Sequence, residues 1–120
     1  MIEILPESQV NILGVKATDY LTNEDYTEVW VPELKRLINQ FGRVRALIYL
    51  DPSFEGWKLK AMWDDAKFGL THRNDFEKIA FVGGHQWMKW GVRVCAHLSF
   101  GEVKYYKHEE LTEAWNWIRK

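Results

Sequence analysis

The chain has 120 residues, of which 47% are hydrophobic, 28% charged and 15% aromatic, so we expect one domain over residues 1–120 and exclude a multidomain enzyme. The 16 basic residues nearly balance the 17 acidic ones, and this net charge of -1 argues against a nucleic-acid partner held through phosphate contacts. A single cysteine, the lack of a signal peptide after Met1 and the lack of a long apolar run favour a cytoplasmic protein without a transmembrane segment.

The beginning of the chain is predicted to form a β-hairpin. Two apolar segments, Ile2–Leu5 and Val10–Ala17, flank a short polar turn that begins at Pro6. Apolar runs on either side of a proline-containing turn are typical of two antiparallel strands. We therefore expect these two segments to pair.

A helix is predicted to follow the hairpin. Thr22 can accept a hydrogen bond from a free N–H of the first turn, and Asp25 adds an acid there. Apolar residues then recur at helical spacing on one face, namely Tyr26, Trp30, Leu34, Leu37 and Phe41. Because Pro32 lacks an amide donor, we expect a kink or two short helices near Trp30–Val31, and Gly42 is the stop signal.

The rest of the chain alternates between predicted strands and helices. The strands are Val44–Leu50, Ile79–Val82 and Glu102–Lys107, and the helices span residues 59–70, 85–98 and 111–118. Together with the hairpin, this gives the order ββαβαβαβα. Alternating elements of this kind predict an α/β fold with a mostly parallel sheet of four or five strands and an antiparallel hairpin member.

A ligand of such a sheet usually lies beyond the carboxyl ends of the strands. Three loops are predicted there, at Thr18–Thr22, Asp51–Trp57 and Gly83–Trp87. The second is the richest in functional groups, which are carried by Asp51, Ser53, Glu55, Gly56 and Trp57. The favoured structural alternative is an ordinary turn, because Asp-Pro is a common way to leave a strand.

The third loop places Gly84 and His85 before a predicted helix, whose free N–H groups would favour an anion. Its glycines have neither dinucleotide-binding nor P-loop spacing, so a tight turn is the preferred interpretation. An acid/base pair of His85 and Asp51, or a nucleophile at Ser53 or Cys95, would depend on the fold bringing the partners together. The four histidines also lack metal-ligand spacing. We therefore predict no enzymatic activity, no metal and no cofactor.

Aromatic residues are unusually frequent, with seven tryptophans. Most lie on predicted core faces, but Trp57 lies in a loop, and Trp117 and Phe68 point away from the apolar faces of their helices. Packing between helices is the favoured explanation. The alternative is a surface for a partner or an apolar ligand.

Several sequence segments resemble those of a known family: Phe54-Glu55-Gly56-Trp57, the stretch from Lys67 to Ala80, and Val82-Gly83 followed by Trp87 and Trp90. They are similar to the small bacterial SpoIIAA-like proteins, which are relatives of STAS domains and share a fold with CRAL-TRIO lipid-transfer domains. The resemblance implies the same sheet architecture and little about activity.

The resemblance also implies a difference at the second helix. STAS anti-sigma-factor antagonists have a phosphorylatable serine in an Asp-Ser-Ser-Gly-like turn there, whereas this chain has Phe54-Glu55-Gly56-Trp57. Ser53 lies earlier in the loop, after a proline. The position of the phosphorylated hydroxyl is thus filled by Glu55 or its neighbours, and we hypothesise that the charge of Glu55 partly imitates a phosphate.

The sequence thus predicts a non-enzymatic STAS-like interaction module that binds a protein or a small apolar ligand at the βα-loop edge. The expected contact residues are Asp51, Ser53, Glu55, Gly56, Trp57, Phe68, Gly84 and His85. The alternative is a carrier of lipid or another hydrophobic small molecule, which would need an enclosed apolar pocket of about 300–1,000 Å³. A homodimer is left open.

Overall fold

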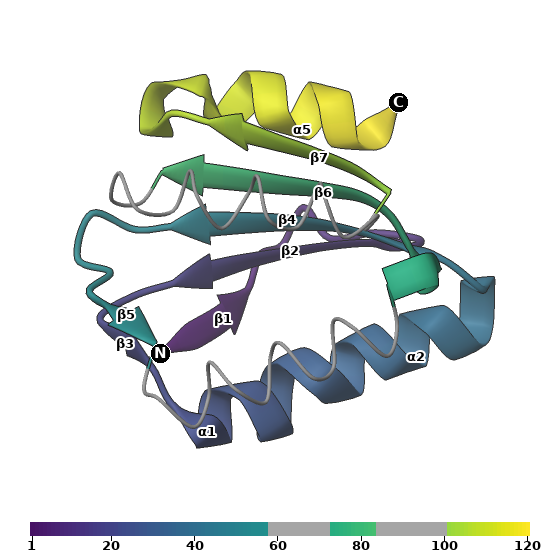
Figure 1. Cartoon of the computed structure of the whole chain (residues 1–120), viewed down its shortest axis with the longest axis horizontal. Helices are drawn as coiled ribbons and strands as arrows, with labels where there is room; N and C mark the ends of the chain where they lie inside the picture. Colours follow the sequence, from purple (N-terminus) through teal and green to yellow (C-terminus); the bar gives the residue numbers. More distant parts are fainter. Residues whose placement is uncertain (58–72, 84–100) are drawn as a thin grey trace.

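In a computed structural model that describes residues 1–57, 73–83 and 101–120, five strands form one sheet in the order β1-β2-β4-β6-β7 (Figure 1). The strands are β1 Ile2–Ile4, β2 Ile12–Ala17, β4 Val44–Leu50, β6 Phe76–Gly83 and β7 Glu102–Tyr106. β1 runs antiparallel to β2, and the other neighbours are parallel. The predicted α/β fold with its N-terminal hairpin is confirmed.

The connection inside the hairpin is longer than predicted. Ile2 pairs with Ala17 and Ile4 with Val15, so β2 begins only at Ile12. Just before it, Gln9 and Ile12 exchange two backbone hydrogen bonds of 3.1 and 2.9 Å around the two-residue turn Val10-Asn11. The segment that was assigned to the second strand therefore starts with a separate tight turn.

The first helical region changes geometry where a break was expected. It consists of α1 (Asn23–Asp25), a π-helical segment (Tyr26–Trp30) and α2 (Val31–Phe41). The start is capped as predicted, because the Asp25 amide donates to Thr22 Oγ1 at 3.2 Å. Pro32 lies in the first turn of α2, directly after the π-helical segment, and its ring lacks the N–H that a continuous helix would use there. The helix ends at Gly42, which has a φ of 82° and an amide that donates to the Ile38 carbonyl.

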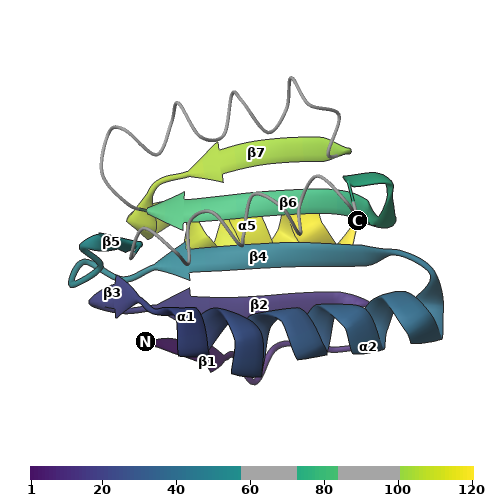
Figure 2. The same cartoon turned by 60° about the horizontal axis from the view of Figure 1, so that its bottom comes forward.

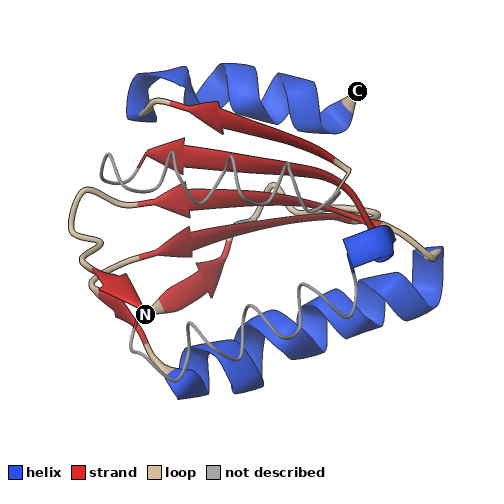
Figure 3. Ribbon diagram, in the orientation of Figure 1, coloured by secondary structure: helices blue, strands red, loops and turns tan. Residues whose placement is uncertain are grey.

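Helix α2 covers one face of the sheet, and α5 (Leu111–Arg119) covers the other (Figures 2 and 3). The α2 side is built from buried Leu13, Val15, Trp30, Leu34, Leu37, Val44, Ala46, Phe76 and Ile79. The α5 side is built from buried Ile12, Leu47, Ala80, Val82, Ala114, Trp115 and Ile118. The Trp115 ring lies so close to the backbone of Gly14 that a Cβ there would be 2.9 Å from Cζ2. The predicted helices at 59–70 and 85–98 lie outside the described residues.

Trp117 is accounted for by packing on its own side of the sheet. The ammonium groups of Lys78 and Lys104 lie 5.1 and 5.2 Å from its ring centroid. Lys78 Nζ also donates to the Trp117 carbonyl oxygen at 3.2 Å. The ring is therefore half-buried under lysine side chains from β6 and β7 rather than left for a partner. Among the described residues, no helix is long and apolar enough to cross a membrane.

Candidate functional site

The carboxyl ends of the four parallel strands meet at one edge of the sheet, where their arrowheads point in Figure 1. At the same edge, β3 (Tyr20–Leu21) pairs in parallel with β5 (Gly56–Trp57) as a small second sheet. The predicted loop Asp51–Trp57 is thus corrected at its end, where a two-residue strand forms. Its pairing with Tyr20–Leu21 joins two of the three loops that were expected to form the site.

Asp51 holds the turn that leaves β4. Its carbonyl accepts from the Phe54 amide at 2.8 Å, and its carboxylate accepts from the Ser53 amide at 3.0 Å. Lys16 Nζ lies 3.6 Å from the other carboxylate oxygen. The Ser53 hydrogen bonds, assisted by Lys16, lower the pKa of Asp51 below its ordinary value. Asp51 is therefore charged at neutral pH and acts in the turn, as the structural alternative expected.

Glu55 is the exposed acid of this loop. Its amide donates to the Asp19 carbonyl at 2.6 Å, and its carboxylate accepts a hydrogen bond from the Tyr20 hydroxyl. That hydrogen bond and the nearby negative charge raise the pKa of Tyr20. Asp19 has a φ of 54°, which lies in the left-handed region. These two contacts add to the β3–β5 pairing in joining the two loops.

Backbone hydrogen bonds and a buried side chain hold the loop against the main sheet. The Asp51 amide donates to the Ala17 carbonyl at 3.0 Å, which joins the ends of β4 and β2. The ring of Phe54 is 1% exposed and packs with Ala17 and Leu50. Because Phe54 is anchored and Glu55 is bonded to Asp19, the exposed groups of Ser53 and Glu55 have a defined position.

The other expected contact residues stay untested. The structure describes the backbone of Gly56 and Trp57, and the role of the Trp57 ring as an anchor stays a prediction. Phe68, Gly84 and His85 lie outside the described residues. The structure therefore brings together Asp51, Ser53, Glu55 and the backbone of Gly56, and it leaves the contribution of the third loop as a prediction.

His108 is a residue of this edge that sequence reasoning missed. It follows β7 in a short helical turn, His108–Glu110, and lies edge-on to the Tyr49 ring with centroids 5.6 Å apart. Its imidazole packs directly over Gly83, whose φ is 83° and where any Cβ would clash with the ring. Its place immediately after a parallel strand was the available signal, because that loop reaches the same edge.

The one histidine among the described residues is engaged with the backbone. The Nε2 atom of His108 faces the Leu50 carbonyl rather than a carboxylate or a hydroxyl. Within the ranges 1–57, 73–83 and 101–120, no three side chains of His, Cys, Asp and Glu gather as metal ligands. The pairing of Asp51 with His85 and the environment of Cys95 lie outside the described part.

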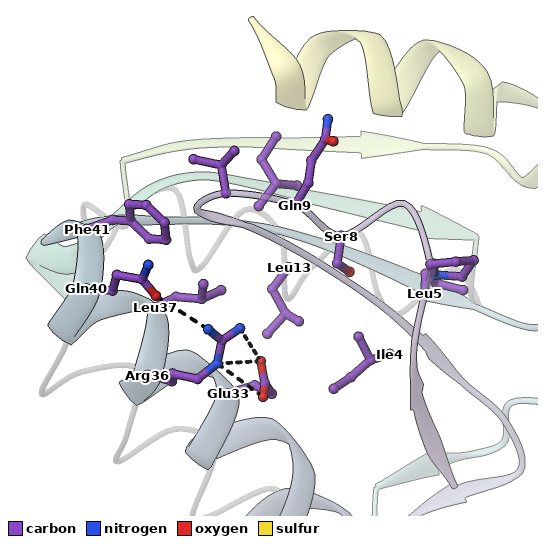
Figure 4. Close-up of a pocket in the computed structure, with 13 residues that line it drawn as sticks. Ile4, Leu5, Ser8, Gln9, Leu13, Glu33, Arg36, Leu37, Gln40 and Phe41 are labelled. Atoms are coloured by element: carbon purple, nitrogen blue, oxygen red, sulfur yellow. Dashed lines mark hydrogen bonds and ion pairs between the residues drawn. The ribbon is translucent and has the colours of Figure 1, made fainter.

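A pocket of about 530 Å³ lies near the other end of the sheet, between the segment before β2 and the last turns of α2 (Figure 4). Ile4, Leu5 and Leu13 line it on one side, as Figure 4 shows, and the α2 residues include Leu37 and Phe41. Arg36 lies at the α2 wall, where its Nη2 atom is 2.9 Å from Glu33 Oε2. Sequence reasoning missed this pocket because it assigned Val10 to a strand.

Comparison with known proteins identifies the relatives of this chain. Residues 12–119 match the family model described as SpoIIAA-like. A crystal structure of an uncharacterized protein from the DUF3478 family with a SpoIIAA-like fold, from Shewanella loihica PV-4, is 32% identical, with a TM-score of 0.77. The match covers 98% of this chain and 93% of that one. No curated protein matches.

Proposed function

Because the chain belongs to the SpoIIAA-like family, we propose that it is a non-enzymatic interaction module whose protein partner docks on the Asp51–Glu55 loop. The observation that carries the proposal is the way this loop is held. Hydrogen bonds from the Asp51 and Glu55 amides and burial of Phe54 fasten it, while Ser53 and Glu55 face solvent. A loop that is already ordered loses little conformational entropy when a partner binds.

The charge of the edge indicates the chemistry of the partner. The described acids near the strand ends, Asp19, Asp25, Asp51, Glu55, Glu109 and Glu110, outnumber the described cations there, Lys16, Lys107 and the Met1 ammonium. A partner surface with lysine or arginine side chains would complement this edge and would associate faster at low salt. The exposed carboxylate of Glu55 is the group that such a surface would contact first.

The test is a comparative capture experiment on the intact chain. Wild type, the double variant Ser53→Ala/Glu55→Ala and the control Glu113→Gln, which alters an exposed acid on α5, are each immobilised and exposed to a lysate of the source cells. We expect at least one protein to be retained by wild type and the control, released by salt, and absent from the double variant. If all three capture the same set, neither the docking site nor a phosphate-like role of Glu55 survives.

The carrier alternative is favoured by one observation, the size of the pocket beside α2. Its volume of about 530 Å³ falls in the range of small-molecule sites, and it is open to solvent on one side rather than enclosed. Its lining is mixed rather than purely apolar, since Ser8, Gln9 and Gln40 contribute polar groups beside Glu33 and Arg36. A native mass spectrum of protein purified gently from its source tests this alternative: an adduct of lipid-like mass supports a carrier, and a clean mass leaves the interaction module.

A further inference from the structure

The outer edge of β1 carries backbone groups that face away from the sheet. The Leu5 amide donates to the Gly14 carbonyl, and the Thr18 amide donates to the Met1 carbonyl, both at 2.8 Å. In an antiparallel pair, alternate residues face the partner strand, so the peptide groups of Ile2 and Ile4 point outward. β1 is the end of the described sheet, and no described strand pairs with that side.

The pocket beside α2 borders this free edge and is rimmed by exposed apolar side chains. Ile4 is 43% exposed, Val10 67% and Phe41 41%, and all three line the pocket. Within the described residues, they are three of the five large hydrophobic residues that are exposed. Apolar exposure is thus concentrated here rather than scattered over the surface, as recognition sites show.

Val10 is held in a conformation that its side chain disfavours. Its φ is 54°, and it is the first residue of the two-residue turn between Gln9 and Ile12. A β-branched residue rarely adopts the left-handed region, and glycine is the usual choice at such a turn position. The packing of the described chain does not explain the valine, because its side chain is mostly in solvent at the pocket. A contact with another molecule would explain it.

The geometry points to a second binding surface, beyond the docking loop proposed above: an extended segment of another protein adds to β1 as a strand and places an apolar side chain in the pocket beside α2. The outward N–H and C=O groups of Ile2 and Ile4 can form hydrogen bonds with a partner that presents C=O and N–H groups in alternation at strand spacing. A polypeptide presents such groups, and an acyl chain does not. Ile4 lies on the α2 face of β1, so the incoming residue beside it would point into the pocket.

Glu3 specifies the charge of the incoming segment. It points to the opposite face from Ile2 and Ile4, is exposed, and forms no ion pair within the described residues. Its cross-strand neighbour Lys16 is already close to Asp51. A second copy pairing through the same groups would be centred on Glu3 and would set two like carboxylates opposite each other. The favoured occupant is therefore a different chain that carries a lysine or arginine between two apolar residues.

The experiment starts from a phage-displayed library of random linear peptides selected against the intact wild-type protein. Recovered peptides are synthesised, and their affinities are measured for wild type and for variants. We expect sequences in which apolar residues alternate with a basic residue. Ile4→Pro removes an outward N–H without touching the β1–β2 hydrogen bonds, and it should weaken binding about tenfold.

Two further variants separate binding from folding. Val10→Gly should weaken peptide binding and raise the thermal midpoint, because it removes both the contact and the strain. Glu3→Lys should weaken binding about two- to fivefold, with recovery when the basic residue of the peptide is changed to Glu, whereas the control Glu113→Gln should bind like wild type. If Val10→Gly instead lowers the thermal midpoint and leaves the peptide affinity unchanged, Val10 does not belong to the peptide-binding surface.

Three outcomes overturn the proposal as a whole. The first is a selection that returns no binding peptide. The second is a set of recovered peptides that bind Ile4→Pro as tightly as wild type. The third is a wild-type dimer that Ile4→Pro converts to a monomer, which would assign the edge to self-pairing. None of them affects the Asp51–Glu55 loop, because they concern the outer side of β1, which is separated from β4 and its loop by β2. The two proposals therefore fail independently.

Discussion

The Nε2 atom of His108 lies 2.6 Å from the carbonyl oxygen of Leu50, which ties the segment after β7 to the end of β4 across the intervening β6. A carbonyl oxygen only accepts, so Nε2 carries the proton. At the carboxyl edge, the end of β4 is therefore bonded on both sides. The His108 contact links it to the segment after β7, and the hydrogen bond from the Asp51 amide to the Ala17 carbonyl links it to the end of β2.

Removing this contact should loosen the edge. We expect His108→Ala to lower the free energy of unfolding by about 1–2 kcal/mol, through loss of the hydrogen bond and of the packing on Tyr49. Urea unfolding followed by circular dichroism measures the change. The control is Glu109→Ala, which alters an exposed side chain on the same turn. Equal stability of His108→Ala and wild type would show that the bond contributes nothing.

Gly83 should be coupled to the same imidazole. In the wild-type background, Gly83→Ala introduces a Cβ that clashes with the His108 ring at a positive φ, so we expect a loss of more than about 2 kcal/mol. In the His108→Ala background the clash is absent, and only the strain of the positive φ, about 1 kcal/mol, should remain. A double-mutant cycle measures the difference, and additive losses would contradict the packing.

Stability should fall at low pH through the ion pair of Arg45 and Glu77. The Arg45 Nη2 atom lies 2.7 Å from Glu77 Oε1, and this hydrogen bond lowers the pKa of Glu77. A lowered folded pKa means that the stabilisation is present above the unfolded pKa of ~4.3 and is lost as pH falls through the folded value. Glu77→Gln should be less stable than wild type at pH 7 and should show a shallower loss on going to pH 3. Urea unfolding of both proteins at pH 7 and pH 3 measures these losses. If wild type and Glu77→Gln lose the same free energy of unfolding between the two pH values, the ion pair does not contribute to the pH dependence.

Tyr20 should report on the charge of Glu55. Because the Glu55 carboxylate accepts from the Tyr20 hydroxyl and opposes its ionisation, the pKa of Tyr20 is raised. In Glu55→Gln the negative charge is gone, so Tyr20 should ionise at lower pH than in wild type. An alkaline titration of the Tyr20 ring signals by NMR measures this, with Glu109→Gln as the control. An unchanged titration would mean that the two side chains do not interact in solution.

The sequence by itself determined the elements whose pattern is local. Val44–Leu50 is mostly apolar on both faces, and the structure gives β4 those same bounds. Thr22 and Asp25 begin the first helix, Pro32 marks its change of geometry, and the Asp51-Pro52 pair opens a turn. Capping, proline geometry and burial period act within a few residues, so they can be recognised without knowing the fold.

The tertiary structure alone decided what depends on distant partners. β6 begins at Phe76, three residues before the predicted start, and Glu77 and Lys78 in this added part bond to Arg45 and to the Trp117 carbonyl. β5 has two residues and exists because Tyr20–Leu21 lies beside it. His108 bonds to a carbonyl 58 residues away, and the pocket beside α2 needs a hairpin turn and a helix end together. No local period encodes such contacts, because the groups that satisfy each other become neighbours only when the chain has folded.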